Sequence, residues 1–126
     1  MNEKQRARNE EEIKELLAEL ILRRVKDPRV TNVSITHVEA STDYSVAKVL
    51  YNVVEGGQTD VAAVQKGLES CKRYLRTQIM KRMRLRVTPE LVFIYDKSLD
   101  RAMKIEELLA QIRREEDERE KGAEHD

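Results

Sequence analysis

The sequence predicts an α+β fold, in which helices and strands follow the order α-β-β-α-β and a further helix comes last. Three observations lead to this prediction. Apolar residues recur at three- and four-residue spacing in three segments, which is typical of helices with one buried face. Elsewhere they alternate with polar residues or form a short apolar run, which is typical of strands. The two prolines and the one glycine pair stand between these segments, where such residues end regular structure.

The first helix is predicted to start at Asn9, because an Asx side chain can cap it and the acids at 10–12 follow in its first turn. Apolar side chains between residues 13 and 25 then share one face. Asp27–Pro28 ends the helix, since proline disfavours the α conformation in the residue before it. Residues 1–8 are mostly polar and are predicted to form a flexible N-terminus.

Two strands are predicted over residues 31–41 and 44–54, and the short turn between them implies an antiparallel hairpin. The apolar phase of the first strand changes near Thr36–His37, which predicts a β-bulge there. A third strand is predicted over residues 90–95, the most apolar run of the chain.

A second helix is predicted from about residue 60 to 82, with Thr59 or Asp60 as its cap. Its apolar residues fall within about 80° of arc, and most of its cations project outside that arc. Residues 9–97 are thus predicted to form one domain, in which two amphipathic helices cover one face of a three-stranded sheet. The other face must be polar, bind a ligand or be covered by the last helix.

The last helix is predicted over residues 98–114, with Ser98 as its cap. Its apolar stripe consists of Ala102, Ile105, Leu109 and Ile112. This stripe either packs on the domain's own sheet or docks a partner helix, in which case the protein is an interaction module. Residues 115–126 hold seven acids against two bases and have no periodic apolar positions. They are predicted to be a charged, disordered tail.

Few residues suggest catalysis or cofactor binding. Cys71 lies on the apolar face of its helix, where a free cysteine is usually a small core residue. This cysteine and the two histidines, His37 and His125, are too few to predict a zinc site. The chain has no glycine-rich phosphate-binding loop. We therefore predict a protein that is not an enzyme and that binds no metal or cofactor.

The cellular setting is predicted from what the chain lacks. One cysteine rules out an internal disulfide framework and fits a reducing compartment. The first residues do not resemble a signal peptide, and no apolar stretch is long enough to span a membrane. We expect a soluble cytoplasmic protein, and we expect it to be a monomer.

Positive charge is concentrated in one segment of a chain whose 24 basic and 24 acidic residues cancel. Between residues 66 and 86, Glu69 is the single acid among eight cations: Lys66, Lys72, Arg73, Arg76, Lys81, Arg82, Arg84 and Arg86. Such crowding of like charges costs stability unless an anion compensates it, and it attracts polyanions. We predict that these eight residues contact RNA phosphates, with Arg23, Arg24 and Arg29 as a secondary patch. A solvated helix face in a charge-rich chain is the other interpretation.

The kind of RNA follows from the residues around these cations. Arg84 and Arg86 alternate with apolar residues, so both can point to one side where the chain enters the third strand. The five aromatic residues do not form a stacking motif of the kind that reads single-stranded bases. Recognition of the phosphates and shape of structured RNA by arginine is therefore favoured.

Several strings of the sequence resemble the bacterial ribosome-binding factor A family. They are Lys26–Val30, Val38–Ser41 with Asp43, Ala47–Val49 and, above all, Met83–Leu91 followed by Phe93 and Tyr95–Asp96. The resemblance covers residues from about 9 to 112. It implies a type II KH-like fold with a kinked helix pair between the second and third strands. It also implies binding to the small ribosomal subunit and its rRNA. Such factors assist late subunit maturation and rRNA processing, including that of the 5′ region, notably in the cold and without catalysis.

The kink between the paired helices is the point at which this chain departs from the family. The family has an Ala-x-Gly sequence there, whereas this chain has Cys71-Lys72-Arg73. Without the glycine, either side-chain contacts bend the helix or it runs straighter. The substitution places an additional cation at the surface that the resemblance assigns to RNA.

Overall fold

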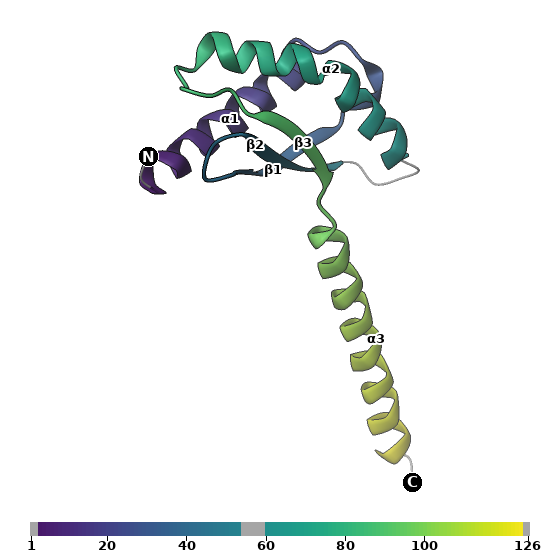
Figure 1. Cartoon of the computed structure of the whole chain (residues 1–126). Helices are drawn as coiled ribbons and strands as arrows, with labels where there is room; N and C mark the ends of the chain where they lie inside the picture. Colours follow the sequence, from purple (N-terminus) through teal and green to yellow (C-terminus); the bar gives the residue numbers. More distant parts are fainter. Residues whose placement is uncertain (1–2, 54–59, 125–126) are drawn as a thin grey trace. The chain divides into compact units, whose positions relative to one another are not determined.

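The computed structural model describes residues 3–53 and 60–124, and the chain forms two compact units, Met1–Asp96 and Lys97–Asp126. The first unit contains α1 (Glu3–Arg23), the 3-10 helix η1 (Pro28–Val30), β1 (Val33–Ala40), β2 (Val46–Val53), α2 (Val61–Arg82) and β3 (Glu90–Tyr95) (Figure 1). The second unit contains α3 (Ser98–Glu124). The predicted α+β fold and its order of elements are confirmed.

The three strands form one sheet in the order β1-β2-β3. β1 pairs with β2 antiparallel, as the short turn predicted, and β2 pairs with β3 parallel. The register between β1 and β2 shifts between Ile35 and His37, so the predicted bulge is confirmed. Because β2 and β3 are parallel, the chain needs a crossover connection that returns it to the end of the sheet where β2 began. α2 is that connection.

The turn between β1 and β2 is built around Asp43. Its carboxylate accepts hydrogen bonds from the backbone N–H of Ser45 (3.0 Å) and from the hydroxyls of Ser45 (2.7 Å) and Ser41 (2.9 Å). These donors, the Ser45 N–H first, lower the pKa of Asp43 from 3.8 to about 2. The next residue, Tyr44, has a left-handed φ of 60°, which is uncommon for a bulky residue. Burial of the ring stabilises this conformation, since Tyr44 is 4% exposed.

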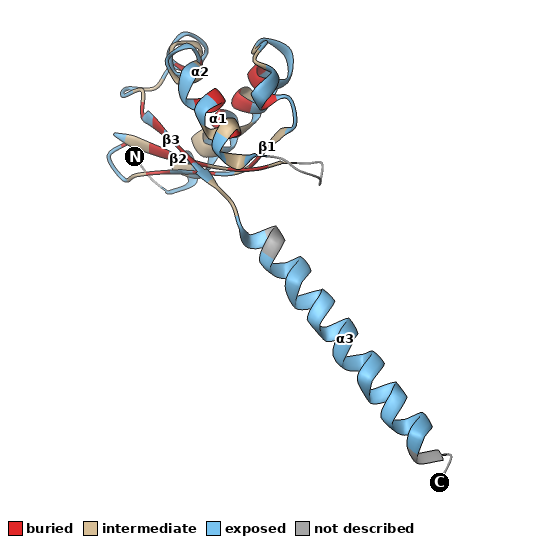
Figure 2. Cartoon of the chain, turned by 90° about the vertical axis from the view of Figure 1, so that its right-hand side faces the viewer, coloured by how far each residue is buried: buried red, intermediate tan, exposed pale blue. Residues whose placement is uncertain are grey.

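α1 and α2 lie on the same face of the sheet, and the core fills the space between the helices and that face (Figure 2). Each helix buries the apolar stripe that its spacing predicts, for example Leu17 and Leu20 on α1 and Leu68 and Leu75 on α2. The strands contribute alternate residues, such as Phe93 on β3, to the same core. The outward face of the sheet is more exposed, as expected.

α2 is one continuous helix that begins at the predicted cap. The carboxylate of Asp60 accepts hydrogen bonds from the N–H groups of Ala62 (3.0 Å) and Ala63 (3.3 Å). Figure 1 shows that α2 changes direction near its middle. In this stretch the Ser70 hydroxyl donates to the carbonyl of Gly67 (2.7 Å) and the Cys71 thiol to that of Leu68 (3.4 Å). Side-chain bonds of this kind to the preceding turn often bend helices.

Gly67 brings α2 unusually close to η1. A Cβ at this position would lie 2.8 Å from Cγ1 of Val30 and 3.0 Å from Cβ of Arg29. Val30 is fully buried, so its side chain cannot easily move aside. This contact fixes the first half of α2 against the segment that follows α1.

Two helix ends differ from the predictions. α1 begins at Glu3 and not at Asn9, and α3 continues to Glu124 instead of ending near residue 114. Helix therefore extends into both of the segments that were predicted to be flexible, residues 1–8 and 115–126. The reason is the same at both ends, because Glu, Lys, Arg, Gln and Ala favour helix even where no apolar stripe marks it. Within the described residues, no helix combines the length and the apolar character needed to cross a membrane.

The second unit is a single helix. Its described side chains, residues 98 and 101–122, are all exposed, including the apolar stripe at Ile105, Leu109 and Ile112. The two interpretations of that stripe, packing on the protein's own sheet or docking a partner helix, both stay predictions.

Candidate nucleic-acid interface

The predicted RNA-binding cations differ in how far their charge is already compensated within the chain. Within residues 3–53 and 60–124, six of the eight have no ion pair: Lys66, Arg73, Lys81, Arg82, Arg84 and Arg86. All six side chains are exposed. Their charges therefore remain available to an external anion.

The second half of α2 and the loop that leads into β3 enclose a groove of about 420 Å³. Three of the predicted cations line it, namely Arg73 and Arg76 from α2 and Arg86 from the loop. The hydroxyl-bearing residues Thr77 and Thr88 and the apolar residues Met80 and Val87 complete its lining. We refer to this site as the arginine groove. It brings together cations from two segments that meet only in the folded chain.

Helical periodicity explains the contribution of α2 to the arginine groove. Arg73 and Met80 lie about two turns apart and Arg76 lies one turn before Met80, so all three share the face that points away from the core. Lys66 continues this face about two turns before Arg73. Lys66 and Arg73 were both predicted to project outside the buried stripe, and the structure confirms that they are exposed.

Arg76 holds the two walls of the groove at a fixed spacing. Its Nε donates to the carbonyl of Pro89 (3.2 Å) and its Nη2 to the carbonyl of Thr88 (2.9 Å). The remaining nitrogen, Nη1, lies 4.0 Å from Glu90 Oε1, in a pair whose side chains are about half exposed. Exposed pairs at such a distance contribute little. Arg76 therefore positions the loop and still contributes positive charge.

The loop between α2 and β3 is anchored at both ends. α2 ends at Arg82, as predicted, and the next residue, Met83, is 9% exposed. Pro89 at the other end is fully buried, and Leu85 between them packs against the core. Arg84 and Arg86 alternate with these anchors and are exposed. Arg86 also lines a second hollow, of about 140 Å³, beside the β1–β2 turn.

Two predicted contacts are already engaged inside the chain. Lys72 pairs with Glu69 one turn away (2.6 Å) and is only partly exposed. Arg29 bonds the carboxylate of Asp27 through Nε (3.0 and 3.1 Å) and Nη2, and its Nη2 also donates to Ser70 Oγ on α2 (3.4 Å). The Arg29 guanidinium lowers the pKa of Asp27 from 3.8 to about 2. Neither residue lines the arginine groove.

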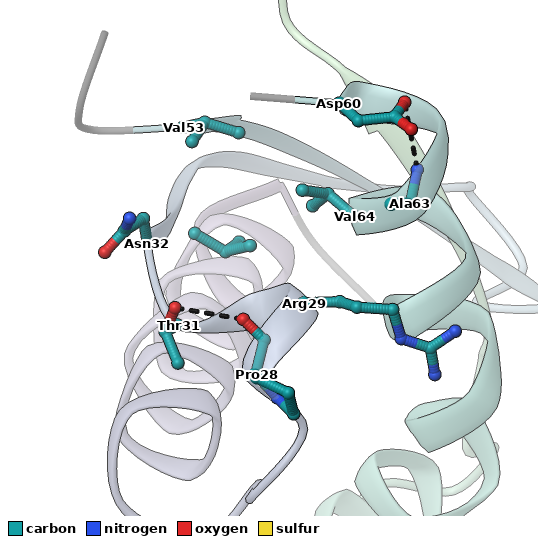
Figure 3. Close-up of a pocket in the computed structure, with 9 residues that line it drawn as sticks. Pro28, Arg29, Thr31, Asn32, Val53, Asp60, Ala63 and Val64 are labelled. Atoms are coloured by element: carbon teal, nitrogen blue, oxygen red, sulfur yellow. Dashed lines mark hydrogen bonds between the residues drawn. The ribbon is translucent and has the colours of Figure 1, made fainter. Parts of the chain in front are cut away.

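A separate hollow of about 200 Å³ lies between η1, the end of β2 and the start of α2. Figure 3 shows that the Arg29 guanidinium is directed toward α2 and away from this hollow. The other charged residue of its lining, Asp60, caps α2. This hollow therefore presents no free cation and is a poorer phosphate site than the arginine groove.

The other predicted residues lie elsewhere. Arg23 and Arg24 are exposed at and just after the end of α1, and neither lines the arginine groove. Whether any of the predicted cations contacts RNA stays a prediction. Among the side chains the structure describes, no group of three or more His, Cys, Asp or Glu is arranged to hold a metal ion.

The sequence analysis missed the residues of the groove that carry no charge. Met80 gave a signal that was overlooked, because it is apolar yet out of phase with the buried stripe of its helix. Val87 and Thr88 gave none, since their place depends on how the loop folds back along α2. Thr77 on α2 becomes a groove residue only because the loop lies against its side of the helix.

Comparison of the sequence with known proteins identifies relatives over most of the chain. The family model for ribosome-binding factor A matches residues 5–109 of the chain. Ribosome-binding factor A from Nitrosospira multiformis is 42% identical over 99 residues, which are 79% of this chain and 78% of the relative.

One crystal structure and one homology model fitted into a map are similar in fold. The crystal structure of ribosome-binding factor A from Thermus thermophilus has a TM-score of 0.66 and 27% identity, over 74% of this chain and 97% of the other. A homology model of the Thermus thermophilus factor, fitted into a cryo-electron-microscopy map of a 30S–RbfA complex, has a TM-score of 0.56 and 26% identity, over 70% and 91% of the two chains.

Proposed function

Because the chain belongs to the ribosome-binding factor A family, we propose that it binds the small ribosomal subunit through the arginine groove and the exposed cations beside it. The observation that carries this proposal is the convergence of Arg73, Arg76 and Arg86 in one groove, from two segments of the chain. The Thermus thermophilus relative that was fitted into the map of a 30S complex supports the same partner.

The contact is with rRNA phosphates. Guanidinium groups bind phosphate through two parallel hydrogen bonds, and the anchored loop presents Arg84 and Arg86 at fixed positions. Ordering costs are then small, because the backbone that carries these side chains is already held by Met83 and Pro89. Lys66, Lys81 and Arg82 on α2 and Arg84 in the loop are exposed and add positive charge to the same two segments.

Membership of the family supports a wider biological role, which we also propose. The protein assists late maturation of the small subunit and processing of its rRNA, including the 5′ region, and is most needed in the cold. It acts by binding as a monomer in the cytoplasm, without a cofactor and without catalysis.

The double variant Arg84→Ala/Arg86→Ala tests this proposal. Co-sedimentation with purified small subunits should weaken by about tenfold, because two charge-assisted contacts are lost. The dependence of log Kd on log salt should decrease by about 0.7 to 0.9 for each phosphate contact removed. The circular dichroism spectrum and the melting temperature should stay unchanged, since both side chains are exposed.

A matched control removes the same charge elsewhere. Lys4→Ala/Arg8→Ala changes two exposed cations at the start of α1 and should leave subunit binding unchanged. If the Arg84→Ala/Arg86→Ala variant binds subunits as tightly as this control, the proposed interface is wrong.

A second candidate function is protein binding through α3, and the exposed stripe at Ile105, Leu109 and Ile112 favours it. Truncation after residue 97 separates the two functions. The truncated protein should keep its subunit affinity if the arginine groove carries binding, and should lose all association if the α3 stripe carries it.

A further inference from the structure

The arginine groove carries apolar surface that phosphate binding does not require. Met80 is 58% exposed and Val87 is 45% exposed. Among the large apolar side chains that the structure describes in the first unit, only Leu22 is more exposed. Met80 and Val87 come from opposite walls of the groove, one from α2 and one from the loop.

The hydroxyl groups in the groove are also uncommitted. Within the described chain, neither the Thr77 nor the Thr88 side chain makes a hydrogen bond, although the Thr88 carbonyl accepts one from Arg76. A hydroxyl can donate and accept, so two of them can serve a ribose or the edge of a base. The groove thus combines cations, apolar surface and free hydroxyls in a volume of about 420 Å³.

We propose that this groove holds one unpaired nucleotide of the RNA, with its phosphate on Arg73 and Arg86 and its base against Met80 and Val87. This inference rests on the proposed function, namely that RNA is the ligand of the groove. A nucleotide is the ligand that offers an anion and a flat apolar surface together. The nucleotide must be unpaired, because bases stacked in a helix do not expose their faces to protein side chains.

The sequence favours recognition of RNA shape, because its aromatic residues form no stacking motif. The groove provides aliphatic surface where such a motif has rings, so one base can be held without one. Arg76 keeps both walls in place through its bonds to the carbonyls of Thr88 and Pro89. The apolar pair is therefore preorganised for a base instead of collapsing onto itself.

Binding of three RNA probes to the full-length protein tests the inference. The first is a hairpin with a short single-stranded tail, the second has the same tail with its bases removed, and the third is the hairpin with a blunt end. The wild type should bind the intact tail about fivefold more tightly than the abasic tail. A gain of this size is expected when apolar surface on the order of 40 Å² leaves water.

The variant Met80→Ser/Val87→Thr should bind the intact and abasic tails equally, while its affinity for the abasic tail stays at the wild-type level. Met80→Leu should retain the preference, because it keeps an apolar side chain of similar size. The control Val92→Thr/Met103→Ser alters two exposed apolar residues outside the groove and should also retain it. Unfolding curves of all variants establish that each is folded.

Two results would overturn the nucleotide site. One is equal binding of the intact and abasic tails by the wild type, and the other is a preference that persists in Met80→Ser/Val87→Thr. Small-subunit binding, measured in parallel, separates this failure from that of the proposed function. If wild-type protein binds subunits while either result holds, the phosphate interface stands and the nucleotide site is rejected.

Discussion

Arginines cluster along α2 in two regions. The two regions differ in whether an acid of the same chain compensates the positive charge. Near the first half of the helix, Arg29 is held by the carboxylate of Asp27 and reaches the Ser70 hydroxyl. Near the second half, Arg73 and Arg86 line the groove without a carboxylate partner among the described residues, and Arg76 is bonded mainly to carbonyls. The first arrangement ties η1 to α2, whereas the second leaves positive charge exposed.

This difference shows that the cations counted along a sequence are not all equally free to bind an external anion. Arg29 and Arg86 are the same residue type, and both are exposed. An acid two residues away neutralises Arg29, whereas Arg86 is flanked by apolar residues and Thr88. A cation is available to RNA only where the fold provides no nearer anion.

The largest expected effect concerns the close contact between Gly67 on α2 and the 3-10 helix η1. Gly67→Ala should lower the free energy of unfolding by about 1 to 2 kcal/mol, because the new methyl group would meet the buried side chain of Val30 and the Cβ of Arg29. Chemical denaturation measures this loss. The same change at Gly122 on α3 meets no atom within 4 Å and should be neutral or slightly stabilising. Equal effects at the two glycines would contradict the close approach of α2 to η1.

A smaller effect distinguishes two adjacent cations on α2. Arg73→Ala should weaken RNA binding by about fivefold and reduce the salt dependence by about one phosphate contact. Lys72→Ala should change both by much less, because Glu69 already pairs with Lys72. Filter binding of one RNA hairpin over a range of salt concentrations compares the two variants. Equal losses would mean that the ion pair of Lys72 does not limit its availability.

The smallest effect concerns Asp27, whose pKa in the folded protein is lowered by Arg29 to about 2. A lowered folded pKa stabilises the protein above the unfolded value of about 3.8, and this contribution is lost as the pH falls toward 2. Asp27→Asn should therefore lose slightly less stability than the wild type between pH 4 and pH 2. Asp43 has a similarly lowered pKa, so the variant should keep the part of the acid sensitivity that Asp43 causes.

Asp27→Asn also tests whether the ion pair with Asp27 is what distinguishes Arg29 from the arginines of the groove. If the carboxylate is what withholds the Arg29 charge, RNA affinity at low salt should rise slightly in this variant. Thermal melts at each pH and binding at neutral pH are the two measurements. An unchanged affinity would show that the position of Arg29, and not its partner, keeps it away from RNA.

Much of the fold could be predicted because its signals are local. The buried stripe of α2, the apolar run of β3 and the bulge in β1 all follow from periodicity within a few residues. The ends of α1 and α3 could not be predicted in this way, since exposed charged helices have no stripe to mark where they stop. Asp27 and Glu69 were both noted in the sequence, but their ion pairs with Arg29 and Lys72 were not predicted, although each pair spans only two or three residues.

The site was predicted only in part, for a physical reason. The cations of α2 could be placed on its outer face by phase alone. The position of Arg86 beside Arg73 could not be predicted from phase. This position depends on the hydrogen bonds from Arg76 to the loop and on the pairing of β3 with β2. Met80 and Val87 become neighbours of these arginines only after that pairing.

The parallel pairing of β2 with β3 also sets the order in which the protein can be assembled. β1 and β2 are adjacent in sequence and can pair early, whereas β3 must wait until α2 has been synthesised and packed. A nascent chain that ends at Arg82 already carries most of the positive charge but has no loop to complete the groove. Under the proposed function, selective binding would therefore require the finished domain, and an unfinished chain would attract nucleic acid only nonspecifically.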